Sequence, residues 1–338
     1  MANKKVSWGV LGAARIATNK VIPAMQKGEF SEISGLASRT LEKAQEAAGN
    51  LGIPKAYGSY EELLADPDID AVYNPLPNHL HVPLSIQAAE AGKHVLCEKP
   101  IALSAKEAQQ LIDARDRFGV NITEAFMVRH HPQWLKAREL VNSGQIGDLR
   151  VINWFVSYFN EDPSNIRNKP EWGGGSLMDI GVYPIVTSRF ITGQEPLRVV
   201  GLLERHPEWG IDCVTSALLD FPSVQATFTC ATQVFGYQRA QLFGTKGRIE
   251  IEIPCNAPSD TACKMFLEND PEPHGQSVEV QTFPVTDQYT LQGDAFSRSV
   301  LEKDFSLAGP PIEDAVCNMK VVDAIFESAE SGAWVGLD

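Results

Sequence analysis

Residues 91–100 read AGKHVLCEKP, and this stretch predicts how the first part of the chain folds. Gly92 follows an apolar run, which is typical of the end of a helix. The next residues, His94–Cys97, predict a short strand buried in a parallel sheet. The strand leads into Glu98 and Lys99, and open α/β folds bind their ligands at the carboxyl ends of such strands. Lys99 could therefore hold or polarise a substrate oxygen, although a solvated ion pair at the end of a strand is the alternative.

A second motif lies at the start of the chain. Val6–Leu11 predicts a strand, and Gly12, Ala14 and Ala17 occupy the three small-residue positions of a dinucleotide-binding turn. Gly12 would allow the tight turn, Ala17 would allow a helix to pack closely on the strand, and the amides at the start of that helix would face a pyrophosphate. Because Ala14 replaces the usual middle glycine, the match to this motif is degraded.

The end of the next strand indicates which dinucleotide binds. Glu32–Ala37 predicts a strand and Leu41–Asn50 a helix, which complete a βαβ unit. An NAD-binding chain would carry Asp or Glu at this strand end, whereas here Ser38 and Arg39 offer a hydroxyl and a guanidinium to a 2′-phosphate. Lys43 could add positive charge, so the segment favours NADP. The alternative is that Ser38 caps the following helix and Arg39 is solvated.

Helices and strands continue to alternate as far as Ala125. Further helices are expected at Tyr60–Ala65, Val82–Ala91 and Ser104–Phe118, and further strands at Ala71–Asn74 and Asn121–Ala125. These strands with intervening helices predict a doubly wound parallel sheet of the dinucleotide-binding kind over residues 1–126.

The pattern changes after Arg129. A long helix is expected over His130–Ser143, and strands that alternate with period two then dominate. These strands are Asp148–Phe159, Leu197–Leu203, Cys213–Asp220, Val224–Thr232, Arg239–Phe243, Gly247–Ile253 and Ser277–Phe283. Residues 127–338 thus predict a mostly antiparallel sheet with flanking helices, among them an amphipathic helix at Pro311–Ser328. Because few helices remain to cover so large a sheet, we expect its second face to pack against another subunit.

The segment GGGSLMDIGVYP, residues 173–184, carries a second group of chemically active side chains. Asp179 and Tyr183 are four residues apart, so they project from one face of a helix. A tyrosine phenol can transfer a proton to or from a carbinol oxygen if a nearby cation stabilises its phenolate. Lys99 would be such a cation if the two domains face each other.

The same segment also has a purely structural interpretation. Ser176 and Asp179 have the spacing of a capping box, in which Asp179 would only stabilise the start of a helix. Pro184 restricts Tyr183 and is expected to disturb a continuous helix.

Composition excludes several classes of protein. The chain has 338 residues and a net charge of −14, which argues against a nucleic-acid partner. Its longest apolar runs are too short for a membrane span, and the early first strand leaves no room for a signal peptide. Six scattered cysteines indicate reduced thiols, and no histidine has metal-ligand spacing with a cysteine pair. We therefore expect a cytoplasmic enzyme without a metal.

Taken together, these segments resemble the glucose–fructose oxidoreductase (Gfo/Idh/MocA) family. The resemblance covers nearly the whole chain and is carried by GVLGAARIA (9–17), ASRTLEKAQ (37–45), PLPNHLHVPLSIQAAEAGKHVLCEKP (75–100), EAFMVRHHPQ (124–133), GGGSLMDIGVYP (173–184) and EDAVCNMKVVDAIFESAESG (313–332). It implies an NADP-binding Rossmann domain at 1–126 and a substrate and oligomerisation domain with an open-faced sheet at 127–338. It also implies a homodimer that pairs through the sheets, with a tetramer left open, and a sugar, polyol or cyclic diol as substrate.

The resemblance implies roles for individual residues. Tyr183 would be the general acid and base, Lys99 would lower its pKa and hold the substrate oxygen, and Asp179 would orient the substrate or the tyrosine. The bond before Pro100 is a candidate cis peptide. Contacts to the cofactor, or for the two arginines to the cofactor or substrate, are implied for Gly12, Ala13, Ala14, Arg15, Ile16, Ser38, Arg39, Lys43, Leu76, Asn78, His81, Glu98, Lys99, Arg129, Arg167 and Tyr289.

Tyr183 stands where many members of the family have histidine, which places the chain nearer to the aldose and dihydrodiol dehydrogenases. The activity expected from this resemblance is NADP(H)-dependent hydride transfer to or from a sugar, with C1 of an aldose as the reacting carbon. Exchange between two sugars on a tightly bound NADP is a variant of that reaction. The alternatives are a trans-dihydrodiol or inositol dehydrogenase and, in another class, an NADP-binding sensor without turnover. We expect no counterpart of the long arm of the periplasmic glucose–fructose oxidoreductase, and therefore no permanent retention of the cofactor by such an arm.

Overall fold

The computed structural model describes residues 4–270 and 277–337, which divide into two compact units. The first unit comprises the chain up to Met127 together with Gln288–Met319. The second comprises Val128–Asp287 and the chain from Lys320 onward. The sequence placed everything after residue 126 in the second domain, so the return of residues 288–319 to the first unit differs from that expectation.

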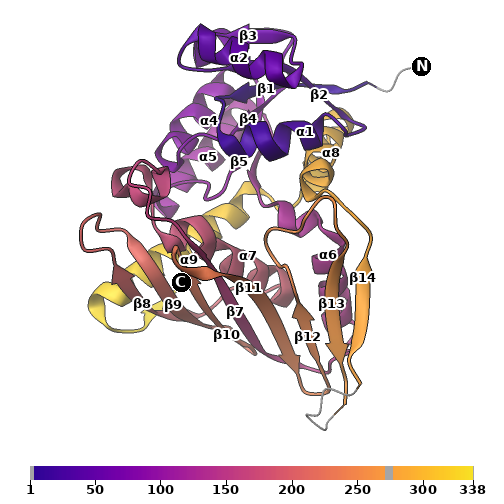
Figure 1. Ribbon diagram of the computed structural model, residues 1–338, viewed down its shortest axis with the longest axis vertical. Helices are drawn as coiled ribbons and strands as arrows, with labels where there is room; N and C mark the ends of the chain where they lie inside the picture. Colours follow the sequence, from indigo (N-terminus) through magenta and orange to yellow (C-terminus); the bar gives the residue numbers. More distant parts are fainter. Residues whose placement is uncertain (1–3, 271–276, 338) are drawn as a thin grey trace. The chain divides into compact units, whose positions relative to one another are not determined.

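A parallel sheet forms the centre of the first unit (Figure 1). Within the described residues it has six strands in the order β3-β2-β1-β4-β5-β6, so the strand order reverses between β1 and β4, as in a doubly wound fold. The strands are β1 (Val6–Leu11), β2 (Ser31–Ala37), β3 (Lys55–Tyr57), β4 (Ala71–Asn74), β5 (His94–Glu98) and β6 (Ile122–Ala125). The predicted architecture is confirmed, although β3, which has only three half-buried residues, was not expected from the sequence.

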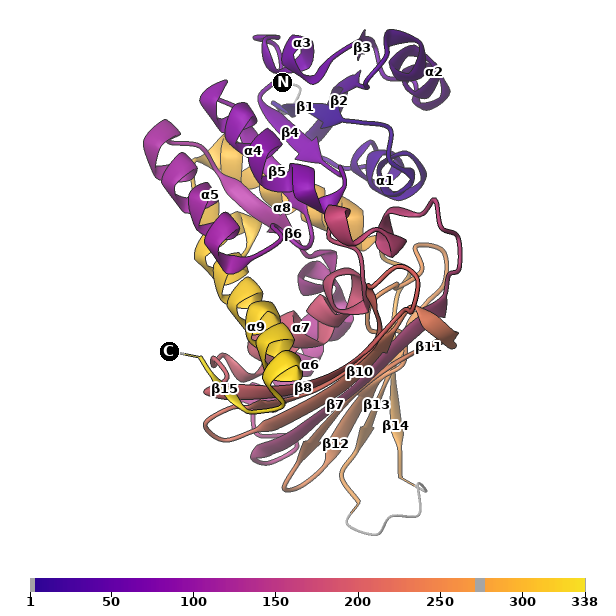
Figure 2. The same ribbon diagram turned by 90° about the vertical axis from the view of Figure 1, so that its left-hand side faces the viewer.

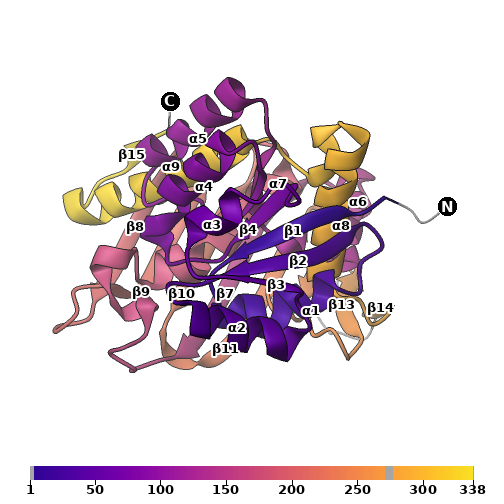
Figure 3. The same ribbon diagram turned by 90° about the horizontal axis from the view of Figure 1, so that it is seen from above.

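Helices cover both faces of this sheet. Figure 3 shows α4 (His81–Glu90) and α5 (Ala105–Phe118) on one face and α1 (Ile22–Met25) and α2 (Leu41–Leu51) on the other. A short helix, α3 (Tyr60–Leu64), precedes β4. The cap of α2 is Thr40, whose hydroxyl accepts a hydrogen bond from the Lys43 amide at 3.4 Å. The alternative in which Ser38 caps this helix is therefore wrong.

Helix α8 (Gln288–Glu302) belongs to the first unit because polar and aromatic contacts tie it to β1 and β2. The Trp8 ring packs on the Phe296 ring at 5.1 Å, and its indole nitrogen donates to Ser297 Oγ at 3.0 Å. The Asp294 carboxylate accepts hydrogen bonds from the amides of residues 29 and 30. These contacts join residues far apart in the chain, which is why local sequence patterns did not reveal them.

The second unit is built on a large mixed sheet. In the described part of this unit it has nine strands, in the order β14-β13-β12-β11-β7-β10-β9-β8-β15. The strands are β7 (Leu149–Phe159), β8 (Arg198–Arg205), β9 (Asp212–Asp220), β10 (Gln225–Ala231), β11 (Gln233–Gly244), β12 (Arg248–Ile251), β13 (Cys263–Glu268), β14 (Glu279–Phe283) and β15 (Val335–Gly336). Only β7 and β10 pair in parallel, so the expected mostly antiparallel sheet is confirmed. Strands β13 and β15 were not expected.

Helices lie on one face of this sheet, as Figure 2 shows for α6 (Pro132–Asn142), α7 (Val182–Thr192) and the last part of α9 (Ile312–Ser331). The Trp134 ring of α6 stacks on the Trp154 ring of β7 at 5.5 Å. Alternate residues of β7, such as Ile152 and Trp154, are buried on this side. The expected helix at 130–143 begins only at Pro132 because residues 127–130 form a 3₁₀ turn.

Two further expectations concern what the chain lacks. Throughout residues 4–270 and 277–337, none of the helices has the length and apolar character that a membrane crossing requires. All six cysteines lie in these ranges, and each has a free thiol.

Candidate active site

The turn after β1 has the close packing that a dinucleotide-binding turn needs. Gly12 has a φ of +96°, and a Cβ there would lie 2.8 Å from Leu76 Cδ2. Glycine is therefore required for both its backbone conformation and its size. The following Ala13 and Arg15 are exposed, Ala14 and Ile16 are half-buried, and Ala17 is fully buried beneath them. The start of this helical segment is thus partly exposed.

The end of β2 carries hydroxyl and cationic groups, as the NADP interpretation requires. Ser38 is only 7% exposed, whereas Arg39 and Lys43 are exposed. Burial raises the pKa of the Tyr60 phenol, and the positive charge of Arg39 partly offsets that rise. Arg39 and Tyr60 therefore lie near each other, and the Tyr60 oxygen would lie 3.7 Å from a Cβ on Gly12. The residues expected to bind a 2′-phosphate therefore lie near the Gly12 turn.

His81 holds two loops of the first unit together. Its Nδ1 lies 2.7 Å from the Pro100 carbonyl oxygen, and its Nε2 lies 2.7 Å from the Leu76 carbonyl oxygen. The ring is 1% exposed, and burial lowers its pKa to about 4. The His81 ring therefore lies between the loops that follow β4 and β5. Next to it, the bond between Lys99 and Pro100 is cis, as expected.

Two hydrogen bonds hold the Glu98 carboxylate at the end of β5. The buried Tyr73 phenol donates to Glu98 Oε1 at 2.6 Å, and the Lys99 amide donates to Oε2 at 3.3 Å. Burial raises the pKa of Tyr73 well above its usual value, and Glu98 and Tyr289 add to that effect. Tyr73 thus remains a hydrogen-bond donor. Tyr289 of α8 lies close enough to Tyr73 to influence its pKa.

The predicted cofactor residues of the first unit therefore gather at one edge of one sheet. Because β1, β2, β4 and β5 are parallel, the residues that follow each strand share its carboxyl edge. These residues are Gly12, Ala13, Ala14, Arg15, Ile16, Ser38, Arg39, Leu76, Asn78, Glu98 and Lys99. Two further predicted contacts, Arg129 and Arg167, belong to the second unit.

In the second unit, two donors contact one oxygen of the Asp179 carboxylate. Asp179 lies on a π-helical turn, Leu177–Gly181, that leads directly into α7 and Tyr183. Its Oδ2 accepts a hydrogen bond from the Tyr158 hydroxyl at 2.6 Å and pairs with Arg167 Nε at 2.8 Å. The Asp179 side chain is 13% exposed and that of Arg167 is 42% exposed. Asp179 raises the pKa of Arg167, with smaller contributions from Tyr158 and Tyr183.

The glycines before this turn allow close backbone approach. A Cβ on Gly174 would lie 2.4 Å from the Arg167 carbonyl oxygen, and a Cβ on Gly175 would lie 2.0 Å from Asp212 Oδ1. The Gly175 amide donates to the same Arg167 carbonyl at 2.9 Å. Gly174 and Gly175 therefore allow the Arg167 backbone to lie close to the segment that carries Asp179.

The structural interpretation of this segment is wrong in its main point. Ser176 makes no capping hydrogen bond to the helix. Its hydroxyl donates instead to Asp212 Oδ2 at 2.7 Å, and that oxygen also accepts from the Leu177 amide at 2.7 Å. Asp212 thus anchors the start of the turn, while Asp179 faces Tyr158 and Arg167. Pro184 lies within α7, and the disturbance expected from it takes the form of the π-helical turn just before that helix.

Sequence reasoning missed Tyr158 and Asp212. Each lies near one end of a strand, β7 or β9, and neither belongs to a motif. The available signal was the alternation of side chains along β7, which places Tyr158 on the same face of the sheet as the buried Ile152 and Trp154. A polar group on the helix-covered face of a sheet needs a partner, which the sequence could not identify.

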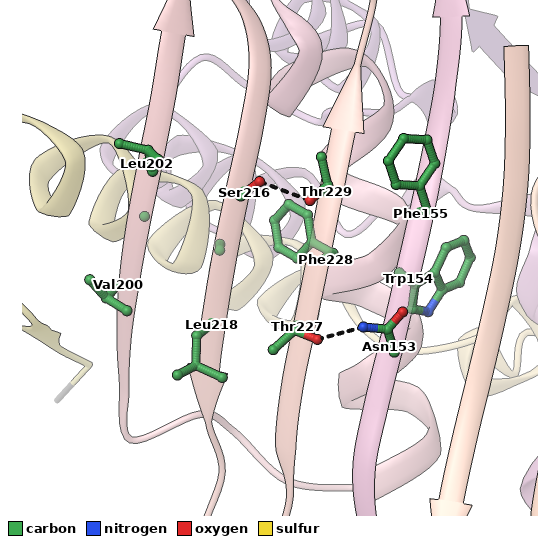
Figure 4. A pocket seen from close by; sticks show the side chains of 12 residues that line it. Asn153, Trp154, Phe155, Val200, Leu202, Ser216, Leu218, Thr227, Phe228 and Thr229 are labelled. Atoms are coloured by element: carbon green, nitrogen blue, oxygen red, sulfur yellow. Dashed lines mark hydrogen bonds between the residues drawn. The ribbon is translucent and has the colours of Figure 1, made fainter. Parts of the chain in front are cut away.

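The open face of the second sheet carries a shallow hollow that contains none of the predicted catalytic residues. Figure 4 shows side chains from β7, β8, β9 and β10 around it. The Asn153 amide donates to Thr227 Oγ1 at 2.9 Å, and the Ser216 and Thr229 hydroxyls lie 2.8 Å apart. The remaining surface is apolar, with Val200, Leu202, Leu218 and Phe155 lining the hollow.

The described ranges contain no group of three or more histidine, cysteine or acidic side chains that could hold a metal ion.

Two family descriptions match this chain. Residues 6–126 match the oxidoreductase family with an NAD-binding Rossmann fold, and residues 134–250 match the GFO/IDH/MocA C-terminal domain. An uncharacterized oxidoreductase of Rhizobium meliloti is 45% identical over 97% of this chain and 98% of its own. A D-xylose 1-dehydrogenase (NADP(+)) of Haloferax volcanii is 39% identical over 98% and 99%. The mouse trans-1,2-dihydrobenzene-1,2-diol dehydrogenase is 34% identical over 72% and 74%.

Solved structures agree with this relationship. The aldose-aldose oxidoreductase from Caulobacter crescentus, complexed with glycerol, has a TM-score of 0.90 at 28% identity over 99% of this chain and all of its own. A 3-ketoreductase from Actinomadura kijaniata, in complex with NADP and TDP-benzene, has a TM-score of 0.87 at 29% identity over 96% and 98%. That enzyme has also been solved with a lysine replaced by alanine and with a tyrosine replaced by phenylalanine. With both of its units matched, this chain belongs to the GFO/IDH/MocA family of oxidoreductases.

Proposed function

We propose that this oxidoreductase transfers a hydride between NADP(H) and a sugar, with C1 of an aldose as the reacting carbon. The observation that carries the proposal is the combination of Lys99 at the end of β5 with Tyr183 and Asp179 on one helical segment. The lysine and the tyrosine substituted in the 3-ketoreductase are as many residues apart in that chain as Lys99 and Tyr183 are in this one. The xylose dehydrogenase and the aldose-aldose oxidoreductase support an aldose as substrate.

The residues at the edge of the first sheet fit NADP. Gly12 supplies the tight turn, and the backbone amides at the helical start beyond it would bind the pyrophosphate. Positions 38 and 39 carry serine and arginine, so no carboxylate is present there to repel a 2′-phosphate. Arg39, with Ser38 and Lys43, would hold that phosphate, and Glu98, Asn78 and Tyr289 would lie toward the other end of the cofactor. NADP, when bound, supplies or accepts the hydride.

The chain's own residues handle the proton and the orientation of the substrate. On oxidation Tyr183 Oη would accept the proton of the sugar hydroxyl, and on reduction it would return a proton to the carbonyl oxygen. Lys99 would stabilise the phenolate and hold the substrate oxygen, since a cation nearby favours the charged form of a phenol. Asp179, fixed by Tyr158 and Arg167, would accept a hydrogen bond from a second hydroxyl of the sugar.

A substrate panel tests this proposal. The purified protein is mixed with aldopyranoses, inositols or aryl trans-dihydrodiols in the presence of NADP⁺ or NAD⁺, and reduced nicotinamide is followed by its absorbance. We expect turnover with NADP⁺ and an aldose. Turnover restricted to an inositol or a dihydrodiol would replace the aldose with the alternative substrate class. Binding of NADP without turnover on any of these compounds would favour a sensor and contradict the proposed activity.

We also propose that the protein is a homodimer that pairs through the open face of the second sheet. In support, Leu202 on that face is 74% exposed and lies among other apolar side chains, while the polar groups beside it bond to one another. A contiguous apolar patch of this kind is typical of a protein interface.

A further inference from the structure

Three separate elements converge on one oxygen atom of Asp179. Tyr158 comes from β7, Arg167 from the 3₁₀ turn Ile166–Asn168, and Asp179 from the π-helical turn Leu177–Gly181. The Tyr158 hydroxyl and the Arg167 Nε lie 2.6 and 2.8 Å from Oδ2. A carboxylate with two donors on one oxygen has little freedom to rotate, so the direction of the whole group is fixed.

The position of Tyr158 makes it a donor rather than a proton acceptor. It points to the helix-covered face of the sheet, and burial raises the pKa of its phenol far above the usual value, with the Asp179 carboxylate adding to the rise. The phenol therefore stays protonated at neutral pH and donates to Asp179. Arg167, Tyr158 and the buried thiol of Cys230 each interact electrostatically with Asp179, and Tyr183 interacts with Arg167.

We propose that Tyr158 is a positioning residue of the active site, which acts by holding Oδ2 of Asp179. This inference rests on the proposed function, in which Asp179 orients the substrate beside Tyr183. Two donors on one oxygen favour the ionised form of a carboxylate. Because Asp179 and Tyr183 belong to one continuous helical segment, the hydrogen bond from β7 also fixes how the carboxylate lies relative to the acid-base phenol.

The test compares Tyr158→Phe with a matched control. Tyr57 in the first unit also donates to a carboxylate oxygen, Asp66 Oδ2, which pairs with Lys55 as well. Tyr57→Phe therefore removes the same kind of hydrogen bond at a different place. We expect Tyr158→Phe to lower kcat/KM about 10- to 100-fold, as for the loss of a hydrogen bond to a charged group. The pH profile of kcat/KM should also change on its acidic side, because Asp179 loses a donor that favours its ionised form. Tyr57→Phe should leave both unchanged.

A double-mutant cycle separates positioning from a merely structural role. If Tyr158 acts through Asp179, then adding Tyr158→Phe to Asp179→Asn should cause little further loss of kcat/KM. Full additivity in this cycle would overturn the inference, as would a Tyr158→Phe enzyme with wild-type kcat, KM and pH profile. Tyr158→His, which keeps a ring donor, provides a second variant if the Phe variant is unstable. Its kcat/KM should lie between those of the Phe variant and the wild type. A kcat/KM no higher than that of Tyr158→Ala would count against the proposal.

The outcome is distinguishable from failure of the proposed function. That proposal fails if no sugar is turned over by the wild-type protein. The present inference fails if the wild type is active and Tyr158→Phe is equally active on the same sugar.

Discussion

We propose that the choice of cofactor depends on Arg39. Its side chain is exposed at the carboxyl end of β2, and its charge reaches the Tyr60 phenol beside the Gly12 turn. Neighbouring Ser38 is buried and does not cap α2, because Thr40 does so. Ser38 is therefore free of the capping role that would compete with phosphate binding. Arg39 can form two hydrogen bonds to a phosphate, a geometry that lysine lacks.

Replacing Arg39 tests this assignment. Arg39→Ala should raise the Kd for NADP about 10- to 100-fold, because a charge-assisted contact contributes about 1.5–3 kcal/mol. The Kd for NAD should hardly change, since NAD has no phosphate at that position. Ser38→Asp should go further by repelling the phosphate. Arg117→Ala, on the far end of α5, is the matched control. Equal losses for NADP and NAD in Arg39→Ala would refute this account of the pocket.

At the scale of elements, the sequence predicted those that have a local signature. The strands β1, β2, β4 and β5 were expected because each is an apolar run that ends in a turn or a polar motif. The π-helical turns at 17–21 and 177–181 were not expected. Each is followed by a helix with a proline in its first turn, Pro23 or Pro184. We attribute the wider turns to these prolines, since a proline ring crowds the carbonyl four residues earlier.

The second sheet, which includes the nine-residue strand β9, has one face that is not covered by helices. Alternation places Val200 and Leu202 of β8 and Leu218 of β9 outward, next to polar groups that already bond to one another. A water-facing sheet surface normally carries more charge. The pattern supports the proposal that a second copy of the chain covers this face.

Leu202→Arg tests that indication. Native mass spectrometry should find a dimer for the wild type and a monomer for this variant, because pairing would bury two unpaired guanidinium groups. Leu135→Arg is the control, since Leu135 is 49% exposed on α6, on the opposite side of the sheet. A dimer that survives Leu202→Arg and dissociates with Leu135→Arg would move the interface to the helical side.

At the scale of the whole molecule, the proposed chemistry draws on both units. Lys99 belongs to the first unit, and Asp179 and Tyr183 belong to the second. The sequence identified these three by motif. It could not identify Tyr158, Asp212 or the return of α8 to the first sheet, because each depends on contacts between residues distant in the chain. Periodicity and turn signals describe neighbours in sequence, and long-range pairs are the part of a site that they leave undetermined.

The central claim is that Tyr183 transfers the proton in an NADP-dependent reaction on a sugar. The most direct test is the kcat of Tyr183→Phe on the best sugar of the panel, measured together with the Kd for NADP and with Tyr57→Phe as the control. We predict that kcat falls about 100- to 10,000-fold, the usual contribution of general acid–base catalysis, while the Kd for NADP stays nearly unchanged. A Tyr183→Phe enzyme that turns over the sugar at the wild-type rate would contradict the account.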